Sequence, residues 1–271
     1  MEELPYCLSL VDCYKNNERE QGRIATKILA SSLIRNLPLG YVNIVRVEPT
    51  APLFRSGREG LEEVWLKKDT RDIPETVVPQ WLPADYIDGT KYSWVLFLGG
   101  GSIALRDTDH LFDTEADILW APLNDALLHS DDCNGYLTEK EIKEEQSEHP
   151  WTRPWVQGAS SNVWAVRGEH YAQMITDWRE VTKNEPSRST SDKIQSAWNR
   201  FLIDTELVVT RFERGEVEFP DLGGSYEHWH QATILNVSKF NTNLRNQFLQ
   251  QQFFGSYFGD SAGTFLDIVD P

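Results

Sequence analysis

The stretch VLFLGGGSIALRDTDHLF, residues 95–112, joins an apolar segment to a charged turn through three consecutive glycines. Residues 92–98 form the most continuous apolar run of the chain, which predicts an interior strand covered on both faces. Gly99–Gly101 then fall at the carboxyl edge of that strand, where open α/β sheets hold their ligands. Glycines at this edge favour close approach of the backbone to a phosphate. The GxGxxG pattern and the P-loop lysine are both absent, so no standard nucleotide motif is present.

The segments around this stretch alternate between strand and helix patterns. Residues 5–11 predict a buried strand, 17–36 a helix with an apolar spacing of four, and 42–48 a second strand. A strand, helix and strand of these lengths require a parallel sheet, so the expected fold class is α/β. Further strands are expected at 117–123, 162–166, 207–212 and 233–237, helices at 171–178 and 191–202, and a short helix at 61–66.

Composition and charge exclude several classes of protein. The chain has 271 residues and a formal net charge of −16, which disfavours non-specific binding to nucleic acid or to an anionic membrane surface. No apolar run approaches the roughly 20 residues of a spanning helix, so no membrane span is expected. The three cysteines form no CxxC motif and predict reduced thiols in a cytoplasmic protein. No repeat or clear linker divides the chain, so residues 1–271 are expected to form a single domain.

The segment YSWVLFLGGGSIALRDTDHLFD, residues 92–113, resembles the central segment of family-8-type, glycogenin-like glycosyltransferases of the GT-A superfamily. In that family an apolar strand ends in Asp-x-Asp-Thr, and the aspartates hold a divalent metal against the diphosphate of a nucleotide sugar. On this match Gly99 and Gly101 occupy the two aspartate positions and Ser102 occupies the threonine position.

Four other segments resemble the family in order and spacing. SLVDCY (9–14) is similar to its uridine-binding first strand, and GASSNVWAV (158–166) to its Asn-Ser-Gly-Val strand. SDKIQSAWN (191–199) is similar to the helix start that lines the sugar pocket. ATILNVSKF (232–240) is similar to the late strand whose histidine is the third metal ligand. The resemblance implies a single GT-A-like domain, 1–271, with a mostly parallel central sheet flanked by helices.

The resemblance also implies an altered metal site. Gly99 and Gly101 replace the two carboxylates, and Asn236 replaces the imidazole. Glycine has no side-chain ligand atom, and asparagine offers only a neutral carbonyl. We therefore expect no metal and no cofactor apart from the nucleotide-sugar donor, with a UDP-sugar as the first candidate.

The candidate site residues follow from the same match. Asp192 is expected to face the donor sugar, and Lys239 to supply the positive charge that the metal no longer provides. Lys193 and Arg245 are the next candidates for that charge. Tyr14 is expected to stack on the base, and Asp12 to accept a hydrogen bond from it. The complete set expected at the donor is Leu10, Asp12, Tyr14, Gly99, Gly100, Gly101, Ser102, Ser161, Lys193 and Asn236.

Other patterns have simpler interpretations. Asp107 and Asp109 form an Asp-x-Asp string, but their place before a helix start predicts capping. His228 and His230 would share one face of a strand, without a clear third metal ligand. Of the ten tryptophans, most are expected in the core. Trp151, Trp155 and Trp164 surround the pocket segment, and one or two of them are expected to contact a sugar.

Two functions remain open at this stage. The first is a metal-independent glycosyltransferase that retains the anomeric configuration and uses a glycan or protein acceptor. The second is a catalytically inactive relative that binds a sugar, a nucleotide or a protein. In either case the aromatic segment 244–258 is a candidate surface for self-association or a partner, although packing on its own core is the simpler account.

Overall fold

The computed structural model describes most of the segments that the sequence assigns to helices and strands. The described residues are 7–12, 19–36, 41–47, 61–66, 80–99, 101–127, 157–185, 190–213, 215–219 and 231–236. Within this part of the chain, no helix has both the length and the apolar character needed to cross a bilayer.

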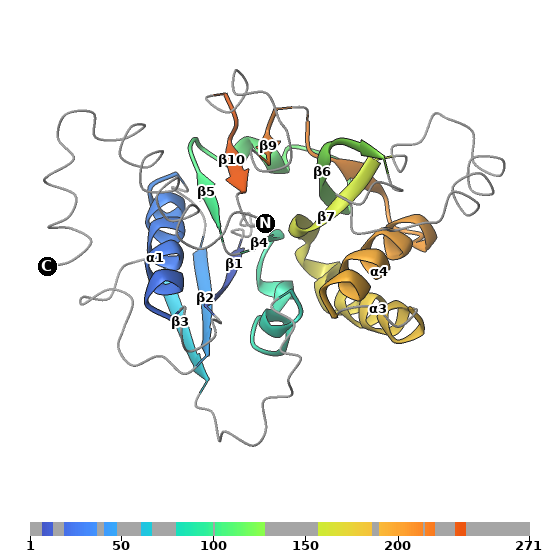
Figure 1. The fold of residues 1–271 in the computed structure, drawn as a ribbon, viewed down its shortest axis with the longest axis horizontal. Coiled ribbons are helices and arrows are strands. Elements are labelled where there is room, and N and C mark those ends of the chain that lie inside the picture. Colours follow the sequence, from blue (N-terminus) through green and yellow to red (C-terminus); the bar gives the residue numbers. More distant parts are fainter. Residues whose placement is uncertain are drawn as a thin grey trace, which may run out of the picture.

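The elements follow one another as an α/β chain (Figure 1). The helices are α1 (Arg19–Asn36), α3 (Tyr171–Asn184) and α4 (Thr190–Asp204), with short 3₁₀ helices η1 (Leu82–Asp85), η2 (Gly89–Lys91), η3 (Asp109–Phe112) and η6 (Gly168–His170). The strands are β1 (Cys7–Asp12), β2 (Tyr41–Val47), β3 (Leu61–Leu66), β4 (Trp94–Leu98), β5 (Ser102–Ala104), β6 (Ile118–Leu127), β7 (Gln157–Arg167), β8 (Val209–Arg211), β9 (Val217–Glu218) and β10 (Ile234–Asn236).

The larger sheet is mixed, whereas a mostly parallel sheet was expected. Its strand order is β3-β2-β1-β4-β7-β6-β8. The β3–β2, β2–β1, β1–β4 and β6–β8 pairs are parallel, whereas β7 is antiparallel to both of its neighbours. The predicted βαβ unit is thus present as β1, α1 and β2. The strand predicted at 92–98 is β4, and it is interior as predicted.

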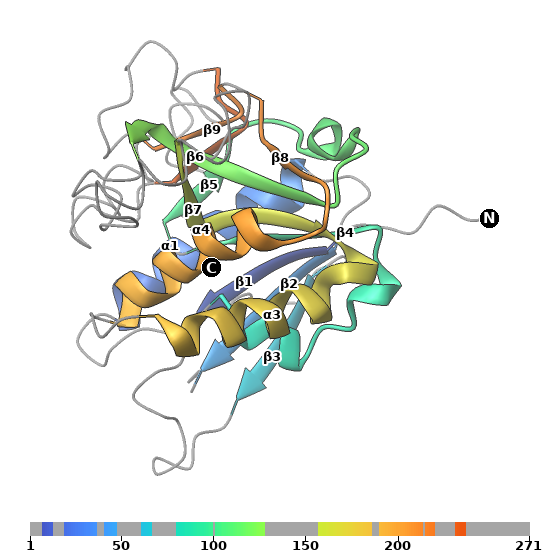
Figure 2. The same cartoon turned by 90° about the vertical axis from the view of Figure 1, so that its right-hand side faces the viewer.

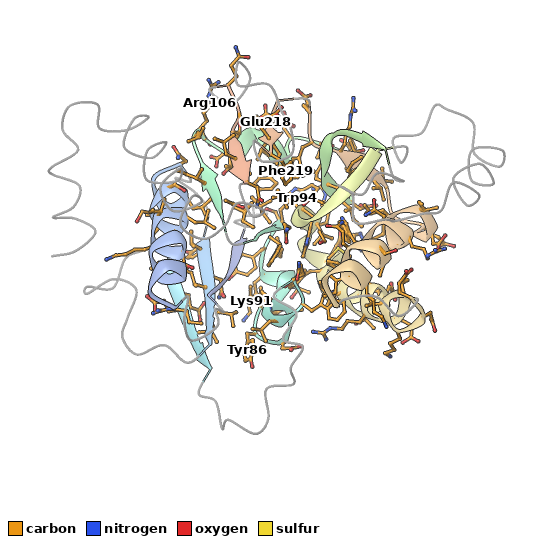
Figure 3. The ribbon with its side chains drawn as sticks, viewed as in Figure 1. Tyr86, Lys91, Trp94, Arg106, Glu218 and Phe219 are labelled. Atoms are coloured by element: carbon orange, nitrogen blue, oxygen red, sulfur yellow. The ribbon has the colours of Figure 1, made fainter. Side chains whose placement is uncertain are left out.

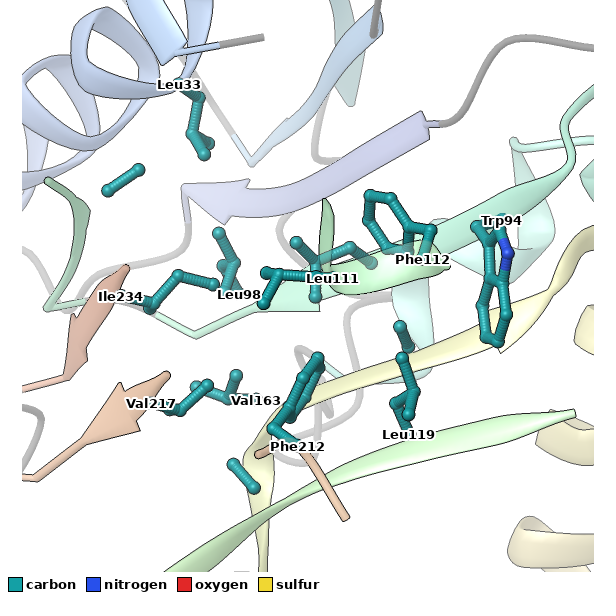
Figure 4. Packing of buried hydrophobic residues seen from close by; sticks show 14 of the residues in the cluster. Leu33, Trp94, Leu98, Leu111, Phe112, Leu119, Val163, Phe212, Val217 and Ile234 are labelled. Atoms are coloured by element: carbon teal, nitrogen blue, oxygen red, sulfur yellow. The ribbon is translucent and has the colours of Figure 1, made fainter. Parts of the chain in front are cut away.

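The core has two layers, one on each face of β4. Trp94, Leu96 and Leu98 belong to a cluster with residues of α1, η3 and the smaller sheet (Figure 4). Val95 and Phe97 belong to a second cluster with α3 and α4, which lie on the opposite side of the sheet from α1 (Figure 1). Every residue of β4 is therefore buried, as its unbroken apolar sequence predicts for a strand covered on both faces.

The last predicted strand, 233–237, forms part of a separate small sheet. This sheet has the order β5-β10-β9, with β10 antiparallel to β5 and parallel to β9. Side chains of α1 hold it in place: Ser32 Oγ accepts the Ala104 N–H at 3.1 Å, and Asn36 Nδ2 donates to the Ala104 carbonyl at 3.1 Å. The small sheet therefore lies next to the carboxyl end of α1.

The prediction of a short helix at 61–66 is wrong, because these residues form the parallel edge strand β3. Six residues make too few turns for a helix that is stable by itself. Pairing with β2 provides backbone partners, and it places the Glu63 carboxylate 3.0 Å from the guanidinium of Arg46, whose side chain is 3% exposed. The carboxylate thus offsets part of the cost of burying a charge.

Two amide side chains of α4 complete the hydrogen bonding of β7. Ala159 is the partner of Pro122 in β6, and the β6–β7 register shifts before and after this point. Proline has no N–H to donate to the ladder. Gln195 Nε2 and Asn199 Nδ2 instead donate to the Ala159 carbonyl, and Asn199 Oδ1 accepts the Ala159 N–H at 2.8 Å. The proline therefore makes β7 depend on α4.

Replacing Asn199 by alanine tests this dependence. We expect Asn199→Ala to lower the free energy of unfolding by about 1–3 kcal/mol, because a buried backbone N–H loses its side-chain acceptor. The free energy is measured by urea denaturation. Asn184→Ala is the control, since that exposed amide bonds only to a carbonyl of its own helix, and its effect should stay within about 0.5 kcal/mol. Equal losses in the two variants would contradict the role of Asn199.

Candidate functional site

The glycine bend, Gly99–Gly101, follows β4 at its carboxyl end, as predicted. The Gly99 N–H donates to the Asn162 carbonyl at 2.7 Å and so continues the β4–β7 pairing by one residue. A Cβ at position 99 would lie 3.1 Å from the Asn162 Cβ and 3.2 Å from its Oδ1. This approach is closer than ordinary van der Waals contact. A side chain at position 99 would therefore require Asn162 to shift by a few tenths of an ångström.

Gly101 is required for a different reason. Its φ is +97°, a left-handed conformation that residues with a Cβ rarely adopt. Gly100 lies outside the described residues. Close packing at position 99 and backbone conformation at position 101 thus each give a physical reason for glycine in the bend.

A chain of hydrogen bonds connects the bend to the small sheet. Ser102 and Asn236 face each other in the β5–β10 pairing. Asn236 Nδ2 donates to Ser102 Oγ at 2.6 Å, and Ser102 Oγ donates to the Gly99 carbonyl at 2.9 Å. Both side chains are fully buried. The amide at position 236 thus supports the bend through the serine hydroxyl.

Two further amide side chains lie at the bend. Gln80 Nε2 donates to Asn162 Oδ1 at 3.2 Å, and Asn162 is the residue against which Gly99 packs. Gln80 was not among the predicted site residues, and no sequence signal identifies it, because it precedes β4 in a proline-rich region. All the described side chains named here at the bend are neutral.

The first strand brings two predicted residues to the same edge of the sheet. β1 is parallel to β4, with Ser9 opposite Phe97, and it ends at Asp12. The backbones of Leu10 and Asp12 therefore lie beside the end of β4, while their side chains lie outside the described part. Tyr14 lies wholly outside it. The binding roles of these three residues remain predictions.

The start of α4 holds the remaining candidates. Asp192 and Lys193 occupy its first turn, and Lys193 is half-buried. Ser161 is buried, and its Oγ donates to Gln195 Oε1 at 2.8 Å, so its described contact is with α4. The neighbouring Asn162 is the residue of β7 that touches Gly99. Lys239 and Arg245 lie outside the described residues, and the roles of all these candidates at a donor remain predictions.

The residues at the three expected metal positions do not suit a divalent cation. Gly99 and Gly101 have no side-chain donor atom, and the amide nitrogen of Asn236 donates to Ser102. Within the described residues, no group of three or more His, Cys, Asp or Glu side chains gathers in a way that could hold a metal ion. Divalent cations in such sites prefer carboxylate or imidazole ligands.

The structure also describes some of the other sequence patterns for which a function was considered. Asp107 Oδ1 accepts the Asp109 N–H at 2.8 Å next to the start of η3, but the N-cap residue of η3 is Thr108 and its side chain makes no capping hydrogen bond, so neither aspartate is the predicted N-cap. Trp164 is fully buried and stacks on Phe97 with ring centroids 5.2 Å apart. It is a core residue, as expected for most of the tryptophans, whereas Trp151 and Trp155 lie outside the described residues. The segment that contains His228 and His230 and the aromatic segment 244–258 lie outside the described residues.

Comparison with solved structures shows a GT-A-like α/β fold. The galactosyltransferase LgtC, solved with donor and acceptor sugar analogues, matches with a TM-score of 0.52 and 9% identity over 93% of this chain and 96% of that chain. The glycosyltransferase GlyE of Streptococcus pneumoniae matches with a TM-score of 0.53 and 13% identity over 96% of this chain and 64% of that one. A glycosyltransferase involved in glycosylation of the major capsid of PBCV-1 matches with a TM-score of 0.53 and 8% identity over 91% of this chain and 99% of that chain. No protein-family model and no curated protein sequence matches the chain.

Placing aspartate at both positions 99 and 101 tests the glycine bend. We expect the double variant Gly99→Asp/Gly101→Asp to lower the free energy of unfolding by about 2–4 kcal/mol, because one side chain displaces Asn162 and the other forces a strained φ. Urea denaturation measures the loss. Gly215→Asp is the matched control, since Gly215 has a φ of +89° in open space, and it should lose only about 1–2 kcal/mol. A double variant as stable as this control would contradict the interpretation.

Proposed function

We propose that this chain is a glycosyltransferase that binds a nucleotide-sugar donor at the glycine bend and transfers the sugar without a metal ion. The observation that carries the proposal is the fold match to glycosyltransferases, which for LgtC covers more than nine tenths of both chains. LgtC was solved with donor and acceptor sugar analogues. The bend lies at the carboxyl edge of an interior strand, which is where sheets of this class hold their ligands.

The shape of the bend supports a diphosphate more than a bulky apolar group. Glycines allow the backbone to approach a phosphate closely. The Ser102–Asn236 hydrogen bonds fix the bend from behind. The donor base would then lie along the end of β1, with Asp12 as acceptor and Tyr14 as the stacking side chain. The remaining members of the donor set are Leu10, Gly100, Ser161 and Lys193.

The charge of the departing diphosphate must be balanced by side chains in this proposal. The side chains described at the bend are neutral, and the protein as a whole carries −16. Lys239, three residues beyond Asn236, is the first candidate for this task, and Lys193 and Arg245 are the next. A cation placed where negative charge develops stabilises the transition state as a metal would. Asp192 would face the donor sugar and orient its reacting carbon.

The second candidate function is a non-catalytic module that keeps the nucleotide or sugar pocket. The neutral side chains and the fully buried Ser102–Asn236 pair at the bend favour it. A diphosphate without a counter-charge would bind weakly, and its departure would not be stabilised. The charge contributed by Lys239 therefore distinguishes the two candidates.

Calorimetry with UDP tests the proposed independence from metal. We expect the same affinity with Mn²⁺ and with chelator, because the three expected ligands are absent. Lys239→Ala should weaken binding by about 1.5–3 kcal/mol, the contribution of a charge-assisted hydrogen bond. Lys91→Ala is the control, since Lys91 is exposed and lies at the opposite end of the molecule from the small sheet (Figure 3). A gain in affinity of about tenfold or more with Mn²⁺ would show that other residues form a metal site.

A transfer assay separates the enzyme from the binding module. A panel of nucleotide sugars is incubated with the protein, and release of the nucleoside diphosphate is followed with and without glycan or protein acceptors. We expect Asp192→Asn to reduce turnover by about 10²-fold or more while UDP affinity changes little, because the carboxylate acts on the reacting sugar. Nucleotide binding with no turnover of any donor would support the binding module instead.

A further inference from the structure

A groove of about 410 Å³ lies between α3 and the end of α4. The two helices lie side by side on one face of the sheet (Figure 2). One end of the groove is lined by His170 of η6. This short helix directly follows Arg167, which pairs with Trp94 at the start of β4. The glycine bend follows Leu98 at the other end of the same strand. The groove and the bend are therefore at opposite ends of β4.

Carboxylates dominate the polar side of this groove. Asp177 projects from α3, Asp204 is the last residue of α4, and Glu206 follows in the loop. All three are exposed, and no lysine or arginine is among the described residues that line the groove. The carboxyl end of a helix carries a partial negative charge, yet the last turn of α4 has no basic residue. Asp204 therefore adds negative charge where the helix already favours a cation.

The other side of the groove is apolar. Phe201 is 4% exposed, and Val181 and Leu207 beside it are half-buried. Val208, the next residue along the chain, is 56% exposed, which makes it one of three large hydrophobic side chains that are exposed in the described part of the chain. Apolar surface and unbalanced carboxylates thus occur side by side.

We propose that this groove is a docking site for a basic amphipathic segment of a partner protein. Lysine or arginine side chains of the segment would pair with Asp177, Asp204 and Glu206. Its apolar side chains would cover Val181 and Leu207. The net charge of −16 would also speed the approach of such a segment. Nucleic acids and anionic lipids do not fit, because they have the same sign of charge as the groove.

The docking site does not depend on the proposed glycosyltransferase activity. It uses none of the residues assigned to the donor and lies beyond the far end of β4. A partner bound there leaves the bend accessible, so one surface would hold the partner while the other binds the donor. A negative result for either proposal therefore leaves the other intact.

A peptide-binding experiment tests the groove in the full chain. The probe is a short fluorescein-labelled peptide with lysine and leucine on opposite faces of a helix. Its binding to the protein is measured by fluorescence anisotropy. We expect Asp177→Asn/Asp204→Asn/Glu206→Gln to weaken binding by about tenfold or more. Gln173→Lys, which adds one cation to an exposed position of the groove, should also weaken it.

Two controls separate docking from general attraction to an acidic protein. The variant Asp113→Asn/Glu115→Gln/Glu213→Gln removes the same number of exposed carboxylates away from the groove and should bind the probe as the native chain does. A peptide of lysine and serine, which has the charge without the apolar face, should bind at least about tenfold more weakly than the probe. Equal loss in both triple variants, or equal binding of both peptides, would overturn the proposal.

Discussion

The antiparallel pairing of β4 with β7 holds the two parts of the sheet together, because it joins the parallel strands β3, β2, β1 and β4 to β7 and its neighbours. The hydrogen bond from the Gly99 N–H to the Asn162 carbonyl extends this pairing by one residue. A Cβ at position 99 would lie only 3.1 Å from the Asn162 Cβ, which is closer than ordinary contact. Glycine at position 99 therefore has a structural role in the sheet of this chain.

The fold was predictable wherever one local pattern decided the outcome. The unbroken apolar run of β4 indicates a strand covered on both faces, and the two core layers supply that cover. The segment 61–66 shows the limit of such patterns. Its six residues carry apolar and acidic side chains at spacings that fit either structure, and a long-range contact, Glu63 with the buried Arg46, accompanies the strand. The dependence of β7 on α4 was equally hidden, because it arises from a proline opposite Ala159 in another strand.

The place of the glycine bend was predictable, but its hydrogen bonds were not. The apolar strand and the glycines after it located the bend, and the parallel β1 ends at the same edge. The Ser102–Asn236 hydrogen bond joins residues far apart in the sequence, so no local pattern contains it. Ser161 and Asn162 show a related difficulty. Neighbouring residues of a strand point to opposite faces. A motif that contains both residues therefore does not show which of the two side chains contacts the bend.

The strand order has a consequence for how the chain folds during synthesis. β4 is entirely apolar, and its partner β7 begins at Gln157, long after β4 has ended at Leu98. While a ribosome makes the intervening residues, one edge of β4 has no partner. Exposed apolar edges of this kind bind other unfinished chains, and sheets that close through distant pairings form slowly. The residues between β4 and β7 therefore set the interval during which the nascent chain needs protection from aggregation.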